Sequence, residues 1–350
     1  MLNLTDRKWK EFKIKEITEK INISKSINYG ETIPGNNIFI GRRSDNNGIQ
    51  GFVTNNIVEK KNCITIGMVG TMKAFWQNND FLASQNILIL RNHNFNKYNS
   101  HFLITLINQL LKKYSYGNPV KKETFCHQKI MLPINSNNEP DYEFMSCYIK
   151  ERMDSKYKVY IDYCEKKIKK IKETININFL NNKLNYEPFK INNLFKLEKV
   201  YGKPLENYNA GNIPYISTSG INNGLISYVK NDDGVSKGNC ISVDPIKGTT
   251  FYQPYDFIGR GFSGASINLL RNNDFNEFKY VFIATCVSNT AKLKASYANL
   301  FNGDRLKNAK ILLPVNNDNI DYKYIENYIK IKELEKYEEY LSYLKEEAYV

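Results

Sequence analysis

The sequence has few of the residue types that most catalytic and metal-binding sites require. Only 3 histidines occur in 350 residues, and the 6 cysteines are scattered without a CxxC pair. This pattern excludes the common zinc motifs and favours reduced, mostly buried thiols over a disulfide framework. No apolar run approaches the roughly 20 residues that span a bilayer, and the charged start lacks the apolar core of a signal peptide. We therefore expect a cytoplasmic protein with no metal site and no membrane partner.

Motifs for nucleotide binding and catalysis are missing or weak. No P-loop is present, and no NPPY-like tetrapeptide of an amino-methyltransferase. Gly259–Gly264 fits G-x-G-x-x-G, but the next segment, Ala265–Leu270, predicts a strand where a dinucleotide site needs a helix. Asp141 and Glu165 fit a loose PD…ExK nuclease pattern, yet one predicted helix would hold them about 36 Å apart, too far to share a cation. The sequence therefore predicts no catalytic residue and no cofactor bound by this chain.

The sequence has fewer acidic than basic residues. The sequence has 49 Lys and Arg against 36 Asp and Glu, a net charge of +13. On a folded cytosolic protein this excess favours an anionic partner, nucleic acid before a membrane surface. The abundance of Asn, Lys, Ile and Tyr leaves open a second explanation, in which an AT-rich genome produced the bias without any function. The hydrophobic fraction of 42% suffices for sizeable cores, and the length indicates about two domains.

The chain contains one long internal repeat. Asn47–Ile49 returns as Asn223–Leu225, and Phe75–Gln77 returns as Phe251–Gln253, both 176 positions later. A period of this length indicates a duplicated domain rather than a stacked solenoid. In each copy, short apolar runs separated by Asn, Gly and Pro predict a mixed α/β globule of the α+β class. We place the two globular domains at residues 1–138 and 184–316.

Each globule is followed by a long helical pattern, over residues 139–183 and 317–350. Apolar residues recur there with the 4-3 spacing of a coiled-coil seam. The seam residues are Tyr157, Ile161, Cys164, Ile168 and Ile171 in the first segment, and Leu334, Tyr337, Leu341 and Leu344 in the second. Neither helix is apolar all round, so we predict that the two helices pair as an antiparallel coiled coil. The alternative is that each helix packs on its own globule.

Basic, aromatic and amide residues gather in the predicted loops of both globules. Residues 1–138 hold 19 Lys and Arg against 9 Asp and Glu, and residues 186–315 hold 15 against 10. Lys and Arg suit phosphates, whereas Asn, Gln and Arg also suit base edges. We predict DNA contact by Arg42, Arg43, Lys73, Lys113, Tyr114, Tyr116, Asn118, Lys121, Lys122, Asn222, Asn223, Lys247, Gln253, Arg260, Lys292, Lys294, Tyr297, Arg305 and Lys307. For any single residue, an ordinary solvated loop is the alternative.

The order of these motifs resembles a known family. W-x-x-F at Trp9 is followed by I-P, N-G-I, F-x-Q, Y-S-Y-G and then K-I-x-L-P…P-D-x-x-F-M-x-x-Y-I-K over Lys129–Lys150, and the series is repeated. It is similar to the specificity (S) subunits of type I restriction–modification systems and of the related type IIB systems. The similarity covers nearly the whole chain. In the second copy Ala295 and Ala298 replace Tyr114 and Gly117, so DNA contacts do not simply carry over between copies.

The resemblance implies two target-recognition domains joined by two long helices in an antiparallel coiled coil. Each domain would read one half of a bipartite DNA target, while the helices set the spacer and dock DNA methyltransferase subunits. S-adenosylmethionine and Mg²⁺ would be bound by those partners, which methylate adenine N6, and a restriction subunit is a further candidate partner. Two alternatives stay open: an orphan or phage-borne DNA-binding adaptor or decoy without its own methyltransferase, and an enzyme in its own right. The missing motifs argue against the enzyme.

Overall fold

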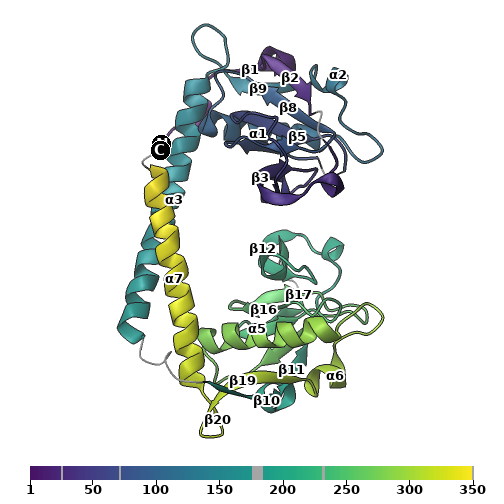
Figure 1. Cartoon of the computed structure of the whole chain (residues 1–350), viewed down its shortest axis with the longest axis vertical. Coiled ribbons are helices and arrows are strands. Elements are labelled where there is room, and N and C mark those ends of the chain that lie inside the picture. Colours follow the sequence, from purple (N-terminus) through teal and green to yellow (C-terminus); the bar gives the residue numbers. More distant parts are fainter. Residues whose placement is uncertain (25–26, 71, 176–183, 231–232, 349–350) are drawn as a thin grey trace. The chain divides into compact units, whose positions relative to one another are not determined.

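The computed structural model describes residues 1–24, 27–70, 72–175, 184–230 and 233–348, with side chains through residue 345. The chain divides into two compact units, Met1–Tyr160 and Ile161–Val350. The two units share most of their succession of sheets and helices, and the second unit adds the short strands β14 and β20 (Figure 1). The last part of the first predicted helical segment, residues 176–183, lies outside the described residues.

The first unit is built on a four-stranded antiparallel sheet in the order β2-β8-β5-β6, with a second sheet β4-β3-β7 and the pair β1-β9. Its strands are β1 (Trp9–Lys13), β2 (Lys20–Ile23), β3 (Pro34–Ile40), β4 (Ile49–Val53), β5 (Cys63–Gly67), β6 (Ala74–Gln77), β7 (Leu82–Ala83), β8 (Ile87–Arg91) and β9 (Lys129–Pro133). Its helices are α1 (Lys97–Leu111), α2 (Lys122–Phe125) and the first part of α3 (Tyr142–Thr174), with 3-10 turns η1 (Leu4–Asp6), η2 (Ile14–Glu16), η3 (Tyr29–Glu31) and η4 (Asn46–Gly48).

The second unit repeats this plan with sheets ordered β11-β18-β15-β16, β13-β12-β17-β14 and β10-β19-β20. Its strands are β10 (Asn185–Lys190), β11 (Lys196–Lys199), β12 (Ala210–Ile216), β13 (Leu225–Val229), β14 (Val235–Ser236), β15 (Cys240–Val243), β16 (Thr250–Gln253), β17 (Phe257–Gly259), β18 (Asn268–Arg271), β19 (Lys310–Asn316) and β20 (Asn319–Ile320). Its helices are α4 (Ile191–Leu194), α5 (Glu277–Lys294), α6 (Gly303–Lys307) and α7 (Tyr322–Ala348), with 3-10 turns η6 (Leu205–Asn207) and η7 (Asn222–Gly224).

One amphipathic helix covers the main sheet of each unit. Asn96 caps α1 by accepting hydrogen bonds from the backbone N–H groups of Tyr98 and Asn99, a role that asparagine performs well. The helix then buries Leu103 and Ile107 in the core that the sheet residues also enter. In the second unit α5 packs on β15, β16 and β19, as Figure 1 shows. These layers confirm the predicted α+β fold in both copies.

Each long helix begins on its own globule. The Tyr148 ring of α3 meets the Phe102 ring of α1 edge-on, with centroids 5.7 Å apart. In α7, Tyr328 meets Phe282 of α5 at 5.7 Å, and Glu326 pairs with Lys279 at 3.3 Å. The alternative that each helix packs on its own globule is therefore correct for the first turns of both helices.

Beyond those turns, the second unit contains a pair of helices. The end of α3, from residue 161 on, runs antiparallel to α7: Tyr163 contacts Tyr337 at 6.1 Å between centroids, and the Thr174 carbonyl accepts a hydrogen bond from Lys330 Nζ at 3.4 Å. The predicted seam faces inward to different degrees. Cys164 and Ile171 are fully buried, whereas the half-buried members in this unit are Ile161, Ile168, Leu334, Tyr337, Leu341 and Leu344; Tyr157 is half-buried but belongs to the first unit. The 4-3 spacing therefore predicted this pairing correctly.

Two other predictions can be compared with the structure. All 6 cysteines are free thiols, of which Cys63, Cys164 and Cys240 are buried. The segment after Gly264 leads into β18 rather than a helix, as the sequence predicted. Within the described ranges, no helix is both long and apolar enough to cross a bilayer.

A charge in the seam should separate the helices of the second unit. We expect Ile171→Asp to lower the free energy of unfolding by about 3 kcal/mol or more, because Ile171 is 2% exposed and a carboxylate there would be buried without a partner. Urea denaturation followed by circular dichroism measures this loss. The matched control is Lys170→Asp on the exposed neighbour, with an expected change within about 0.5 kcal/mol. Equal losses in the two variants would contradict the buried seam.

Candidate nucleic-acid interface

In each unit a β-hairpin ends in the sequence Asn-Asn-Gly. The turn between β3 and β4 holds Asn47 at φ 51° and Gly48 at φ 78°, and the turn between β12 and β13 holds Asn223 at φ 55° and Gly224 at φ 78°. These angles lie in the left-handed region, which Asn and Gly adopt more easily than other residues. The two turns therefore share one backbone conformation. We call residues 41–50 and 217–226 the hairpin tips.

A β-bulge follows each turn. The register shift between β3 and β4 leaves Gln50 outside the pairing, and the equivalent shift between β12 and β13 leaves Ile226 outside. A bulge adds one unpaired residue to a strand and re-aims its side chain. Both side chains are exposed, Ile226 by 47%. Each hairpin tip therefore presents one bulged side chain to solvent.

A buried glutamine holds the turn of the second unit. Gln253 is 1% exposed, and its Nε2 donates to the Asn223 carbonyl at 3.0 Å and to Ser242 Oγ at 2.9 Å. Asn223 Nδ2 in turn donates to Gln253 Oε1 at 3.2 Å and to the Tyr252 carbonyl at 3.0 Å. The prediction that Gln253 reads a base edge is wrong, because its side-chain amide is buried and bonded inside the protein. Asn223 is half-buried, and its contact with DNA stays a prediction.

The first unit repeats this arrangement. Gln77 Nε2 donates to the Asn47 carbonyl at 3.1 Å and to Thr65 Oγ1 at 2.9 Å, and Gln77 is 4% exposed. Because a buried amide without partners would be costly, these bonds fix both the glutamine and the turn. We call this element the glutamine clasp. It explains why F-x-Q and N-G recur in both copies.

Two further predicted contacts are structural. The Arg260 guanidinium donates to the Ala265 carbonyl at 2.7 Å and to Ser263 Oγ at 3.2 Å. It also lies 4.3 Å from the centre of the Phe262 ring, so its donors serve the loop rather than an external base. Tyr114 is half-buried against Phe125, and burial raises the pKa of its hydroxyl. The sequence offered no means of separating these residues from exposed ones.

A second paired feature is a tight turn that carries an exposed tyrosine. In the first unit Ser115 and Asn118 exchange two backbone hydrogen bonds of 3.1 and 3.0 Å, and Ser296 and Asn299 exchange the equivalent pair at 3.2 and 3.1 Å. The tyrosines between them, Tyr116 and Tyr297, are 83% and 85% exposed. An aromatic ring held this far into solvent suits stacking or groove contact. We call these segments the tyrosine turns.

Arg305 stabilises the second tyrosine turn through hydrogen bonds from its guanidinium group. Its Nη1 donates to the carbonyls of Asn299 and Leu300, both at 2.7 Å, and its Nη2 donates to the Lys294 carbonyl at 2.9 Å. Lys307 lies 3.9 Å from Asp304. The other predicted cations of this unit, Lys247, Lys292 and Lys294, are exposed, and their contact with DNA stays a prediction.

In the first unit the hairpin tip and the tyrosine turn line one shallow hollow. Arg42, Arg43, Gln50 and Tyr116 border a cavity of about 300 Å³. Arg42 and Gln50 also border a second hollow of about 220 Å³ on the side of Tyr29. The structure thus brings together three of the predicted residues and adds Gln50, which the sequence analysis missed because a bulge is not visible in strand alternation.

Electrostatics distinguishes the two arginines of this tip. Arg43 Nε and Nη2 donate to the two Asp45 carboxylate oxygens at 2.8 and 3.0 Å. That hydrogen bond, with the charges of Arg43 and Lys73 nearby, lowers the pKa of Asp45. Among the described residues, Arg42 has neither a hydrogen-bond nor an ion-pair partner for its guanidinium. Arg42 is therefore the cation of this tip whose donors are available to a ligand.

The second hairpin tip is uncharged. It presents Thr218, Ser219 and the 65% exposed Ile221 in addition to Ile226, and a Cβ at Gly220 would lie 3.7 Å from Thr249 Oγ1. Burial raises the pKa of Asp244, at the start of that neighbouring loop, against the opposing hydrogen bonds from the backbone of residues 246 and 247. The two units therefore share a frame but offer different side chains.

The remaining predicted contacts of the first unit lie beside its tyrosine turn. Lys113, Asn118 and Lys121 are exposed, and Lys122 is half-buried. Asn222 is exposed at the tip of the second hairpin with φ 50°. The Asn118 side-chain amide also donates to the Lys113 carbonyl at 3.5 Å. The contact of these residues with DNA stays a prediction.

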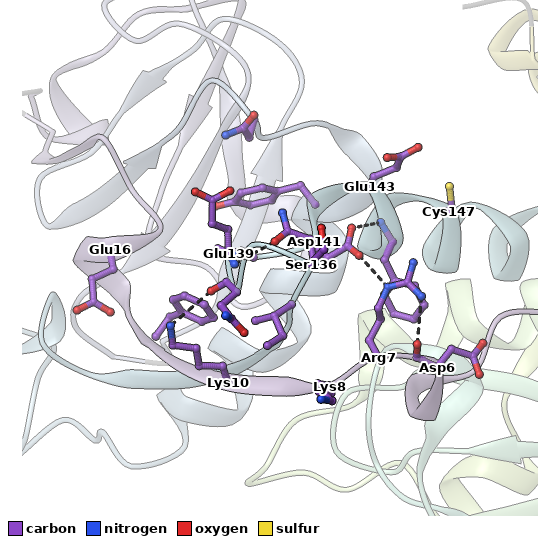
Figure 2. A pocket seen from close by; sticks show the side chains of 18 of the residues that line it. Asp6, Arg7, Lys8, Lys10, Glu16, Ser136, Glu139, Asp141, Glu143 and Cys147 are labelled. Carbon is purple, nitrogen blue, oxygen red and sulfur yellow. Dashed lines mark hydrogen bonds and ion pairs between the residues drawn. The ribbon is translucent and has the colours of Figure 1, made fainter.

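A groove of about 1660 Å³ at the start of α3 has a different character (Figure 2). Asp141 caps α3 by accepting from the Phe144 N–H at 2.9 Å, and its other oxygen accepts from Arg7 Nε at 2.8 Å. Carboxylates such as Glu16, Glu139 and Glu143 also line this groove and would repel DNA phosphates. Over the parts of the chain that the structure describes, no group of three His, Cys, Asp or Glu side chains could hold a metal ion.

Comparison with known proteins agrees with the duplicated plan. The family model for the type I restriction modification DNA specificity domain matches residues 6–159 and 183–341. The specificity subunit S.BcgI of the type II restriction enzyme BgcI from Heyndrickxia coagulans is 27% identical over 318 residues, covering 86% of this chain and 89% of the relative. The crystal structure of a type I restriction–modification S subunit from M. genitalium shares the fold, with TM-score 0.51 and 13% identity over 98% of this chain and 95% of that one.

Removing the glutamine clasp should loosen a hairpin tip without touching its exposed side chains. We expect Gln77→Leu to lower the free energy of unfolding by about 2 kcal/mol, since the Asn47 carbonyl and Thr65 hydroxyl lose a buried partner. Amide exchange at Gly41 and Gly48, whose N–H groups bond within the tip, should accelerate. Gln85→Leu, on an exposed side chain of the same unit, is the control and should leave both quantities unchanged. Unaltered exchange in Gln77→Leu would show that the clasp does not hold the tip.

Proposed function

The chain belongs to the family of type I restriction modification DNA specificity domains, and on that basis we propose that it is the non-catalytic DNA-recognition subunit of a restriction–modification complex. The observation that carries the proposal is the duplication: two hairpin tips have the same backbone and the same glutamine clasp but different exposed side chains. A protein that recognises two different half-sites can use the same backbone scaffold in both domains, but it needs different base-contacting side chains in each. Each unit then recognises one half of a bipartite target.

The excess of positive charge supports affinity for the DNA backbone. Exposed cations such as Lys113, Lys121, Lys292 and Lys294 lie beside the tyrosine turns, where they would meet phosphates on either side of the bases being read. Phosphate contacts fix position and register, and base contacts fix the sequence. We expect the protein to act in the cytoplasm, where bacterial DNA lies.

Catalysis belongs to partner subunits in this proposal. DNA methyltransferase subunits, and a restriction subunit in the complete complex, would supply the chemistry, and they would bind S-adenosylmethionine and Mg²⁺. The paired helices α3 and α7 offer a docking surface, since the exposed Tyr343 lies on α7 and is not one of the seam residues. The relative named above is a type II specificity subunit, which supports a system of the type IIB kind.

DNA binding by the complex with its methyltransferase should depend steeply on salt. If six or more phosphates are contacted, the association constant should fall by about a thousandfold or more between 50 and 200 mM salt, because bound counterions are released. Fluorescence anisotropy with a duplex that carries the cognate target measures this slope. The control is a duplex of the same length with a shuffled target, to which binding should be weaker at every salt concentration. Equal affinity for the two duplexes would refute a recognition function.

Exchange of one globular domain should change one half-site. Replacing residues 1–138 by the equivalent domain of another specificity subunit should alter one half of the methylated sequence and leave the other half and the spacer intact. Methylome sequencing of cells that express the hybrid with the methyltransferase provides the readout. A hybrid in which both half-sites change together would show that the units do not read independently.

A further inference from the structure

The two hairpin tips share their turn conformation, bulge and backbone hydrogen bond, so their side chains can be compared position by position. Both contain a left-handed Asn-Gly pair, a bulge directly after it and a hydrogen bond across the neck, from Gly41 N to the Gly48 carbonyl at 2.8 Å and from Ser217 N to the Gly224 carbonyl at 2.9 Å. With the constant separation of 176, residue 42 corresponds to residue 218, and residue 50 to residue 226. The differences at these positions are therefore differences of chemistry on one scaffold.

The first tip combines an arginine with an amide. A Cβ at Gly41 would collide with the Gln50 side chain, so the glycine allows Gln50 to lie across the neck of the hairpin beside Arg42. Both side chains border the two shallow hollows of the first unit, one toward Tyr116 and the other toward Tyr29. Two neighbouring polar side chains, one a free guanidinium and one an amide, form a ridge between these hollows.

The second tip replaces this ridge by hydroxyl and aliphatic groups. Position 41 is matched by Ser217, Arg42 by Thr218 and Gln50 by Ile226. Ile226 stands beside Tyr228 on the exposed face of β13, and the two are 47% and 52% exposed. An aliphatic side chain has no hydrogen-bond donor or acceptor, so of the groups that base pairs expose in the major groove it suits the thymine methyl group.

We propose that the hairpin tips read base edges in the major groove and that their chemistry assigns a different base pair to each half-site. In the first unit Arg42 donates to O6 and N7 of a guanine, with Gln50 toward the adjacent pair; in the second unit Ile226 and Thr218 contact the methyl group of a thymine. Arginine with guanine and aliphatic groups with the thymine methyl are the pairings that groove geometry favours. The inference rests on the proposed DNA-recognition function and adds which element reads and what it reads.

The bulge gives Gln50 and Ile226 a special place in their strands. The side chains of regular strand residues point alternately to the two faces of the sheet, whereas the bulged residue is left out of the backbone pairing and its side chain is re-aimed. The glutamine clasp lies on the inner side of the turn and keeps the tip from changing its conformation when it contacts a base edge. Residues that are the same in both tips maintain the backbone of the turn. Residues that differ between the tips determine which base pair is recognised.

Transfer of one tip to the other unit tests the proposal. Residues 217–226 (STSGINNGLI) are replaced by residues 41–50 (GRRSDNNGIQ), which have the same length and the same Asn-Asn-Gly turn. The variant complex with its methyltransferase is then presented with a library of duplexes randomised in the second half-site. We expect the selected second half-site to exchange a T·A pair for a G·C pair, while the first half-site stays unchanged.

Single substitutions keep the test independent of whether the graft folds. Arg42→Thr should reduce discrimination for guanine at one position of the first half-site by about tenfold or more. Arg43→Ser is the matched control, since Arg43 pairs with Asp45, and it should weaken binding to all sequences without changing their order. Selection of an unaltered sequence by both the graft and Arg42→Thr would overturn the proposal. A wild-type complex that prefers no sequence at all would instead overturn the proposed function, so the two failures are distinguishable.

Discussion

The interface depends on a buried amide that holds a left-handed turn. In each unit a glutamine at the end of a core strand gives its hydrogen bonds to the carbonyl of an asparagine with positive φ and to a hydroxyl on the neighbouring strand. The turn places the bulge, and the bulge places Gln50 or Ile226. Water cannot compete for the hydrogen bonds of a buried amide, so these bonds hold the base of each hairpin tip in one conformation. The exposed side chains of the tip differ between the two units. Rigidity is what a base-reading element requires, because a flexible tip would adapt to any base pair.

The fold was largely predictable because it rests on repeated patterns. Segments that recur 176 positions apart predicted two similar α+β units. The 4-3 spacing of apolar residues predicted the helix pair that buries Cys164 and Ile171. It was harder to predict which part of each long helix packs on its own globule and which part packs on the other helix. The first turns of α3 and α7 have the same apolar spacing but contact their own globules. Periodicity identifies an apolar face but not the partner that covers it.

The candidate site was predicted less well, for a physical reason that the residues illustrate. Asn223 and Gln253 were chosen as base readers because they are polar, lie near turns and occur in both copies. Gln253 is buried, Asn223 is half-buried, and their side-chain amides are bonded to each other. Repetition marks what the backbone needs, whereas the recognition of two half-sites needs residues that differ. Arg42 and Tyr116, both predicted DNA contacts, border one hollow together with Gln50. Gln50 was not among the predicted contacts, because the register shift that leaves it unpaired is not visible in the sequence.

In the recognition that we propose, two tips of one design contact two different halves of a DNA target. Photo-crosslinking tests it most directly, with a photoreactive amino acid placed at position 50 in one variant and at position 226 in another, each in complex with the methyltransferase and a duplex containing the target. We expect crosslinks to bases of one half-site from position 50 and to bases of the other half-site from position 226. Crosslinks from both positions to the same half-site, or only to bases outside the target, would contradict it.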